Sequence, residues 1–293
     1  MVKNFYQFIL LIFLIAIPLI GENQNTTKPH KNEMGIIIIN DTLFGTDKDY
    51  TGSMGAYYRF KSIPLLIKYQ IDAYTPRKKN KELTVPEQNM HPYAGFGYLE
   101  TEYKILNKNL LATICLQLGS TGKNSYAKGL QDKIHTILNQ STFSGWDSQI
   151  QTKFGYIFNT ELGYIFNTKH FTLLPAISLK IGNLLSKQTV GIQFISGFNY
   201  NQDFLFTNYS NKPNYNILIL YDISNISKNV FLTGFEGYKY GVDIINTVSE
   251  LKIGFNIQYK PYGFTFQNHY QSNEYKSQKN INKYSTLVFY YKF

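Results

Sequence analysis

The chain has 293 residues, of which 43% are hydrophobic and 16% are charged, and its 29 Lys and Arg against 19 Asp and Glu give a formal net charge of +10. The hydrophobic content excludes a disordered chain, and the single Cys excludes a disulfide framework and any cysteine-based metal site. A mean hydropathy of -0.25 with one long apolar run excludes a protein of many membrane helices, since each such helix needs about 20 apolar residues. A β-rich soluble protein and a membrane β-barrel remain.

The first element in chain order is an apolar segment at the N-terminus. Lys3 gives a short positive start, Phe8–Ile20 carries no charge, and the polar segment 22–33 follows without a basic cluster that would stop translocation. This pattern is typical of a cleaved signal peptide, so we predict a signal peptide at 1–21 and one exported domain at 22–293. The excess of basic residues suits an anionic partner, which for an exported protein is expected to be phosphorylated lipid and not nucleic acid.

From residue 35 onward, segments of about ten residues alternate apolar with polar or small side chains. In the clearest of them the odd-numbered positions from Leu251 to Tyr259 are apolar, and the even-numbered positions are polar or glycine. A period of two residues predicts strands. Twelve are predicted, at 35–41, 51–60, 64–75, 92–104, 109–119, 149–165, 170–182, 188–200, 229–241, 248–259, 262–273 and 284–293. A thirteenth candidate, Ile217–Ile223, is rejected because single-chain bacterial barrels have even strand numbers.

The C-terminus helps to distinguish a barrel from a sandwich. Leu287, Phe289, Tyr291 and Phe293 share one face of the last predicted strand, and the chain stops at Phe293. A terminal aromatic residue on an amphipathic strand resembles the assembly signature of bacterial outer-membrane proteins, and implies the barrel assembly machinery as a partner of Phe293. With the export signal and the 16% of aromatic residues, this pattern predicts an all-β fold. We expect a transmembrane antiparallel barrel of 12 strands in the outer membrane.

The best helix candidate, Asn124–Asn139, lies between the fifth and sixth predicted strands. Leu130, Ile134 and Ile137 form an apolar stripe, while Gln131 and His135, four residues apart, share another face. With the N-terminus in the periplasm, this helix lies in an extracellular loop. The extracellular rim would also collect the unusual polar and turn residues, namely Asn40, Asp41, Thr46, Asp47, Asp49, Tyr50, Thr51, Tyr74, Thr75, Pro76, His91–Gly95, Gly119, Gly122, Trp146 and Gln149. Turn chemistry by itself also explains many of these residues.

Four collinear segments of the first half of the chain form a recognisable set. They are IIIINDTLFGTDKDYTGSMG at 36–55, QIDAYTPRKKNK at 70–81, HPYAGFGYLETEY at 91–103, and LGSTGKNSYAKGLQDKIHTILN with GWDSQI between 118 and 150. Together they resemble the outer-membrane lipid A 3′-O-deacylases. The resemblance implies a twelve-stranded barrel with its active site between the wall and the loop helix. It also implies a calcium-dependent esterase that removes the 3′-linked acyl or acyloxyacyl chain of lipid A in the outer leaflet.

The resemblance assigns roles to six residues. His135 is implied as the general base that activates water, with Gln131 as a supporting hydrogen-bond partner. Asn40, Asp41 and Thr51 are implied as a polar floor, in which Asn40 and Asp41 support Ca²⁺, and Lys81 as a basic residue near the reacting ester that binds substrate. The chemistry agrees, because histidine is a suitable base near neutral pH and calcium prefers oxygen ligands. No Ser or Cys nucleophile is required, and the sequence contains no G-x-S-x-G motif.

The sequence departs from the family pattern at two positions. Ser141 stands where the family commonly has an acidic residue, so either Asp132 or Asp147 takes its place or the metal site is weaker. His91 stands where the family normally has Arg, and we interpret it as a packing residue of the rim.

Three alternatives remain. The first is a non-enzymatic barrel, a channel or an adhesin, whose rim motifs are loop architecture. The second is a barrel lipase with a serine beside a histidine, for which His269 and Ser272 are the nearest pair, although residues three apart in a strand face opposite sides. The third is a periplasmic β-sandwich.

Overall fold

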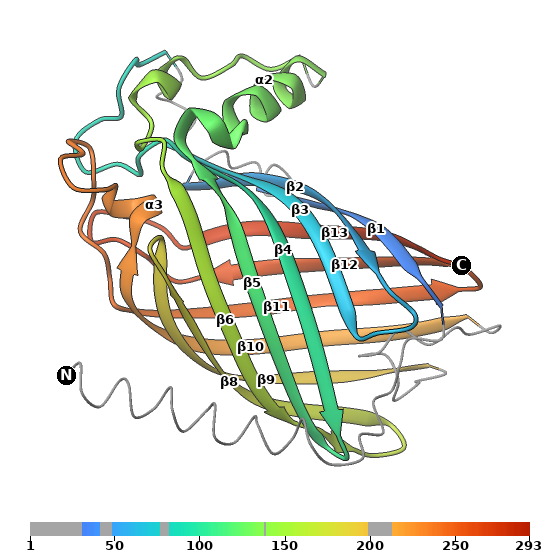
Figure 1. The fold of residues 1–293 in the computed structure, drawn as a ribbon. Helices are drawn as coiled ribbons and strands as arrows, with labels where there is room; N and C mark the ends of the chain where they lie inside the picture. The colour runs from blue at the N-terminus through green and yellow to red at the C-terminus, as the bar shows by residue number, and fades with distance from the viewer. Residues whose placement is uncertain (1–30, 42–48, 77–81, 138, 199–212) are drawn as a thin grey trace.

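The structure is a computed structural model that describes residues 31–41, 49–76, 82–137, 139–198 and 213–293 (Figure 1). For residues 49–51 and 198 it describes the backbone alone. The predicted signal peptide at 1–21, the candidate residue Lys81, and Thr46 and Asp47 lie outside the described residues.

The described chain forms one closed antiparallel sheet. Its strands are β1 (Glu33–Asn40), β2 (Asp49–Arg59), β3 (Leu65–Thr75), β4 (Ala94–Asn107), β5 (Leu110–Thr121), β6 (Phe154–Tyr164), β7 (Phe166–Asn167), β8 (Phe171–Gly182), β9 (Leu185–Phe198), β10 (Asn214–Asn229), β11 (Thr247–Tyr259), β12 (Tyr262–Gln271) and β13 (Asn282–Lys292). Long strands that follow one another in the chain are paired, and β1 pairs with β13 to close the ring. Because β7 is a two-residue strand beside β8, the wall has twelve long strands (Figure 1). The predicted twelve-stranded barrel is confirmed.

Two of the strand predictions are wrong, and both concern the same part of the chain. The segment 229–241 contains the end of β10, the short helix α3 (Val230–Thr233) and a loop, while the rejected candidate Ile217–Ile223 lies inside β10. The Asn229 side chain accepts a hydrogen bond of 3.1 Å from the Phe231 backbone N–H, which caps the helix and ends the strand. The wall has an even number of strands, as the parity argument requires. Parity nevertheless rejects Ile217–Ile223, which is part of a true strand, and keeps 229–241, which is mostly helix and loop.

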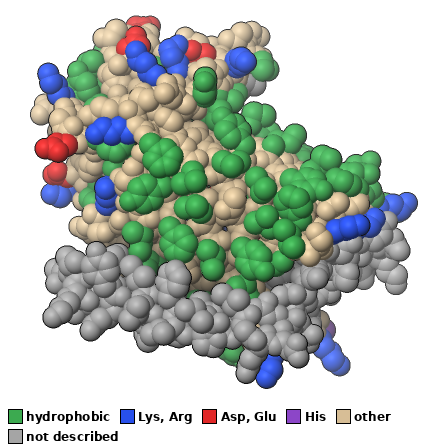
Figure 2. Space-filling view, in the orientation of Figure 1, with side chains coloured by type: hydrophobic (Ala, Val, Ile, Leu, Met, Phe, Trp, Pro, Cys, Tyr) green, Lys and Arg blue, Asp and Glu red, His purple; other side chains and the backbone are tan. Residues whose placement is uncertain are grey.

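Side chains alternate between an apolar exterior and a polar interior. On β10, Tyr215, Ile217 and Ile219 face outward and are exposed, whereas Asn216 and Asp222 face inward and are buried. Figure 2 shows hydrophobic side chains spread over the outer surface of the barrel. This arrangement is typical of transmembrane barrels. None of the described helices is long and apolar enough to cross a membrane.

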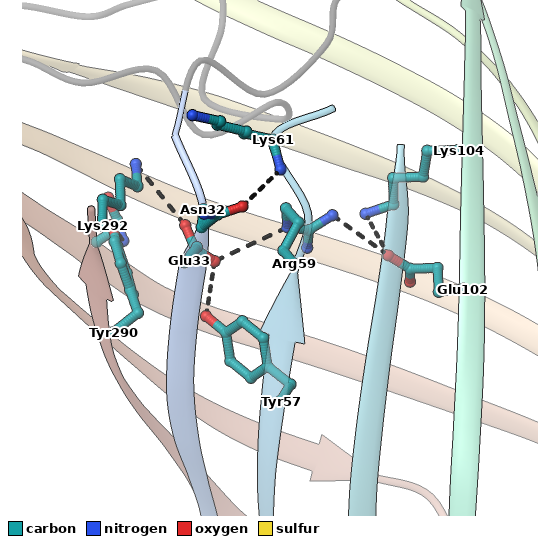
Figure 3. A network of polar contacts seen from close by, with 10 residues as sticks. Asn32, Glu33, Tyr57, Arg59, Lys61, Glu102, Lys104, Tyr290 and Lys292 are labelled. Carbon is teal, nitrogen blue, oxygen red and sulfur yellow. Dashed lines mark hydrogen bonds and ion pairs between the residues drawn. The ribbon is translucent and has the colours of Figure 1, made fainter. Parts of the chain in front are cut away.

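Charged pairs fill the barrel interior at the end where β1 begins and β13 ends (Figure 3). Glu33 accepts a hydrogen bond of 2.8 Å from the Tyr57 hydroxyl, and its two oxygens lie 3.8 Å from Arg59 Nε and 3.9 Å from Lys292 Nζ. A second carboxylate, Glu102, lies 3.7 Å from the same Arg59 guanidinium. Buried charges are tolerated only with such partners, so this end of the interior is occupied by a compensated polar network.

Helix α3 closes the opposite end of the interior. The Phe231 ring stacks on Tyr74 with 5.1 Å between ring centroids, and its centroid lies 5.9 Å from that of Phe96. Val230 and Leu184 are buried in the same cluster. Between this aromatic plug and the charged network lies a polar cavity of about 460 Å³. The barrel is therefore a wall around a largely filled interior, as expected for a small strand number.

Candidate active site

A row of small residues crosses the outer face of the wall near the rim. The strand register pairs Asn40 on β1 with Gly52 on β2, Gly52 with Ala73 on β3, and Ala73 with Gly95 on β4. These residues point outward, because Tyr74, the next residue after Ala73, lines the inner cavity and side chains alternate along a strand. We call Asn40, Gly52, Ala73 and Gly95 the rim row.

The loop between β5 and β6 lies against this row. It contains the 3₁₀ helix η3 (Gly122–Ser125) and the helix α2 (Ala127–Ile137), which together correspond to the helix predicted at 124–139. A Cβ atom on Gly95 would lie 2.5 Å from Ala127 Cβ, and Ala73 packs with Ala127 in one buried cluster. Close approach of the helix thus requires small residues in the wall. Helix α2 lies outside the barrel (Figure 1), so the inner cavity is on the other side of the wall.

The face of α2 that meets the wall carries the polar pair. Ala127, Gln131 and His135 are spaced by four residues and are all buried, the last two with 4% of their surface exposed. Ile137 of the predicted apolar stripe is 79% exposed instead, and Tyr126 at the start of the helix is 69% exposed. Leu130 and Ile134 of the same stripe are half-buried. The helix therefore places its candidate catalytic face against the wall and exposes apolar side chains only at its two ends.

His135 is held by a main-chain oxygen. Its Nδ1 lies 2.7 Å from the Ser141 carbonyl oxygen, and its ring packs on Phe143 with 5.8 Å between centroids. A carbonyl oxygen can only accept, so Nδ1 carries the hydrogen and Nε2 has the free lone pair that a general base needs. The main chain at Ser141 thus orients the imidazole ring of His135.

Asp132 and Asp147 are the expected substitutes for the acidic residue that is absent at position 141, and neither is bonded to His135. Asp132 Oδ2 lies 2.6 Å from Lys128 Nζ, and its side chain is half-buried, with Oδ1 turned away from solvent. Asp147 is largely exposed, with its carboxylate 3.8 Å from Lys123. Both carboxylates are paired with lysines, and the Lys123–Asp147 pair is a surface ion pair.

Gln131 is bonded to the single tryptophan of the chain. Trp146 lies in the 3₁₀ helix η4 (Ser144–Ser148), is fully buried, and donates a hydrogen bond of 2.6 Å from its Nε1 to Gln131 Oε1. Gln131 Nε2 is buried and makes no hydrogen bond among the described residues. The sequence predicts that Trp146 lies at the rim. It does not predict the bond to Gln131, because that contact depends on how the loop folds.

The loop that follows α3 supports η4. The Tyr238 hydroxyl donates a hydrogen bond of 2.8 Å to the Ser148 carbonyl oxygen. Burial raises the pKa of Tyr238 well above its ordinary value, so the hydroxyl stays neutral and keeps its proton for this bond. Gln151 Nε2 donates a further bond of 3.2 Å to the Glu236 carbonyl oxygen. The segment that carries Trp146 is thereby fixed to the plug side of the rim.

The predicted polar floor lies at the same rim. Asn40 is two strands from Ala73 in the rim row, a separation of about 10 Å, and Asp41 follows it fully buried. Thr51 is the extra residue of a β-bulge, because the register shifts between Tyr50 and Gly52. Bulges often adjoin active sites, where they change the direction of a side chain. The site is thus spread over β1 to β4 beneath α2.

His91 lies inside the aromatic plug. It is 2% exposed, its ring stacks on Tyr74 with 5.6 Å between centroids, and its Nδ1 lies 2.7 Å from the Pro92 carbonyl oxygen. These contacts agree with the packing role expected for it.

A serine–histidine pair does not form at His269. Its Nδ1 lies 2.8 Å from Glu250 Oε1 and its Nε2 lies 2.9 Å from Thr286 Oγ1, both inside the barrel. Ser272 instead accepts a hydrogen bond of 2.9 Å from the Ser249 backbone N–H. The geometry gives no support to the serine lipase.

The side chains at the rim include oxygen atoms that could bind calcium. The described residues contain no group of three or more His, Cys, Asp and Glu side chains close enough to hold a metal. The amide oxygen of Asn40 and the buried carboxylate of Asp41 are nevertheless hard oxygen donors of the kind calcium selects, and main-chain oxygens and water commonly complete such a site. The residues fit an oxygen-ligated cation and do not fit zinc, which favours nitrogen and sulfur.

The sequence profile of the LpxR family, described as outer membrane protein LpxR, matches residues 8–293. The chain belongs to the LpxR family. The structure of LpxR from Salmonella typhimurium covers 89% of this chain and 100% of its own, with 20% identity and a TM-score of 0.79. The structure of the β domain of the Bordetella autotransporter BrkA matches 90% of this chain and 100% of its own length, with 11% identity and a TM-score of 0.49. The comparison with characterised protein sequences found no match.

Family membership confirms the resemblance seen in four segments of the sequence. The LpxR family is that of the lipid A 3′-O-deacylases, hydrolases that act on a carboxylic ester, and its members are outer-membrane β-barrels. The likeness to the Salmonella LpxR structure shows the same fold. The predicted fold, enzyme class and location are therefore confirmed.

Proposed function

We propose that this LpxR-family chain hydrolyses the ester that joins the 3′-O-linked acyl or acyloxyacyl chain to lipid A, with His135 as the general base. The observation that carries the proposal is the bond of 2.7 Å between His135 Nδ1 and the Ser141 carbonyl oxygen. It leaves Nε2 as an acceptor on the face of α2 that meets the wall, next to Gln131 and the rim row.

In the proposed mechanism, His135 Nε2 accepts a proton from a water molecule as the water oxygen attacks the ester carbonyl carbon. The carbonyl π electrons move to the oxygen, which becomes an oxyanion. When the oxyanion collapses, the bond to the 3′ oxygen breaks, and the imidazolium returns its proton to that oxygen. The products are a free fatty acid and a lipid A with a 3′-hydroxyl group.

The remaining site residues have supporting roles in the proposal. Asn40 and Asp41 would hold calcium, which when bound polarises an ester carbonyl as a hard Lewis acid. Thr51 contributes to the polar floor at the bulge, and Lys81 binds the substrate near the ester. The position of the site on the outer face of the wall supports a lipid substrate, because a lipid in the outer leaflet could reach α2 without leaving the bilayer. Phe293 is proposed as the signal for the barrel assembly machinery.

The reaction is tested by mass spectrometry of lipid A from a Gram-negative host that lacks a deacylase and expresses this chain. We expect lipid A to lose the mass of the 3′-linked acyl or acyloxyacyl group and no other chain. Loss of a chain from another position would contradict the regiochemistry. If the barrel is folded and calcium is present but lipid A is unchanged, the result would favour the non-enzymatic barrel.

A further inference from the structure

The side-chain amide of Gln131 is fixed in one of its two orientations. Trp146 Nε1 lies 2.6 Å from it, and both side chains are buried. An indole N–H can only donate a hydrogen bond, so the amide atom that faces it is the oxygen. The amide nitrogen must then point away from Trp146.

That nitrogen is a donor without an acceptor. Gln131 is 4% exposed, and its Nε2 makes no hydrogen bond among the described residues. Leaving a buried donor unpaired costs free energy, and such groups in native structures call for an explanation, often a ligand or a catalytic role. A role confined to folding would need only the bond to Trp146 and would leave the nitrogen unexplained.

The unpaired nitrogen belongs to the face of α2 that also carries His135. Gln131 precedes His135 by one helical turn on the same face of α2, against the outer wall at the rim row. A carbonyl oxygen held by Gln131 would place its carbon within reach of water at His135 Nε2. The charge that develops on this oxygen would then face a donor that is already oriented.

We propose that Gln131 Nε2 donates a hydrogen bond to the ester carbonyl oxygen and to the oxyanion formed from it, and that Trp146 is the positioning residue that keeps this nitrogen turned toward the substrate. The inference rests on the proposed function. Without the indole N–H, the amide can rotate by half a turn and present its oxygen, which repels the oxyanion. The single tryptophan thus acts on the reaction through Gln131 without contact with the substrate.

The test measures kcat and KM for release of the 3′-acyl chain from lipid A by the purified full-length barrel in detergent with calcium. Rates are taken per folded barrel, which gel electrophoresis of unheated samples quantifies. Gln131→Glu keeps an oxygen for Trp146 to bond and removes the donor, so we expect kcat to fall about 100-fold. Trp146→Phe keeps an aromatic ring beside Tyr93 and Phe143 and removes the N–H. For Trp146→Phe we expect kcat to fall about tenfold, because the Gln131 amide loses the buried hydrogen bond that sets its orientation. We expect KM to change less than about twofold.

The two substitutions together distinguish positioning from packing. In the Gln131→Glu background, Trp146→Phe should lower kcat no further, because there is no amide left to orient. Ile150→Val is the matched control, since Ile150 is buried at the same rim but is not bonded to the amide, and its kcat should equal that of the wild type.

Three results would overturn the inference: wild-type kcat in folded Trp146→Phe, wild-type kcat in folded Gln131→Glu, or a full additional loss from Trp146→Phe in the Gln131→Glu background. A wild-type barrel that releases no acyl chain would instead overturn the proposed function. The two failures are therefore distinguishable.

Discussion

At the scale of single residues, the candidate base is oriented by the backbone and not by a carboxylate. The carbonyl oxygen of Ser141 lies 2.7 Å from His135 Nδ1, while the nearby acidic side chains make their ion pairs with lysines. A neutral carbonyl fixes the tautomer as well as a carboxylate does, but it adds less stabilisation to an imidazolium. The absence of an acidic residue at 141 is therefore compatible with a histidine base.

This reading predicts that no other carboxylate replaces the missing acid. Asp132→Asn and Asp147→Asn should each keep the rate of 3′-acyl release within about twofold of the wild type, because each carboxylate is paired with a lysine and the ring of His135 is already held by the Ser141 carbonyl oxygen. The rate is measured with purified enzyme at saturating calcium. A loss of tenfold or more in either variant would identify that carboxylate as part of the site.

A second prediction at this scale concerns the metal. Chelation of calcium should abolish acyl release, and calcium but not magnesium should restore it, because the site offers oxygen donors without demanding octahedral geometry. Asp41→Asn removes one ligand charge and should raise the calcium concentration for half-maximal activity about tenfold or more. Full activity in excess chelator would contradict the role of Asn40 and Asp41.

At the scale of elements, helix α2 and the wall form the site together. The helix approaches closely because Ala73 and Gly95 leave room for Ala127. The sequence predicted the helix and the shared face of Gln131 and His135. It did not show that this polar face meets the wall, because an apolar stripe is the usual buried face of a helix, and here Ile137 of that stripe is exposed.

The close approach can be tested with two glycines. Gly95→Val should lower acyl release about 100-fold with the barrel still folded, because valine suits a strand but displaces α2, and a shift of about 1 Å can cost this much. Gly129→Ala is the control within α2, since a Cβ there meets nothing within 4 Å. It should leave the rate unchanged and strengthen the helix slightly. Equal rates for both variants would show that the helix contact is not needed.

At the scale of the whole molecule, the candidate chemistry is on the outside of the barrel, and side chains occupy both ends of the described interior. The rim row faces outward under α2, while the Glu33 network and the Phe231 plug occupy the two ends of the interior. The barrel, its strand number and its polar rim were predictable from alternation and parity. The plug was not, because Val230–Thr233 has the composition of a strand and becomes a helix only through Asn229 and its packing on Tyr74 and Phe96. The Gln131–Trp146 bond is likewise a product of tertiary structure.

An interior with side chains at both ends predicts a barrel that does not conduct. The purified protein in a planar lipid bilayer should show no steady ionic current, because paired side chains and the aromatic plug fill the path. Regular current steps at low voltage would contradict this description and favour the channel alternative.

The central claim is that His135 on the outer wall activates the water that cleaves the 3′ ester. The most direct test compares acyl release from lipid A by purified wild type and His135→Gln, with exposed His170→Ala as the control and equal amounts of folded barrel. A lost general base predicts a fall of about 100-fold or more in His135→Gln and no change in His170→Ala. Wild-type rates in folded His135→Gln would contradict the account.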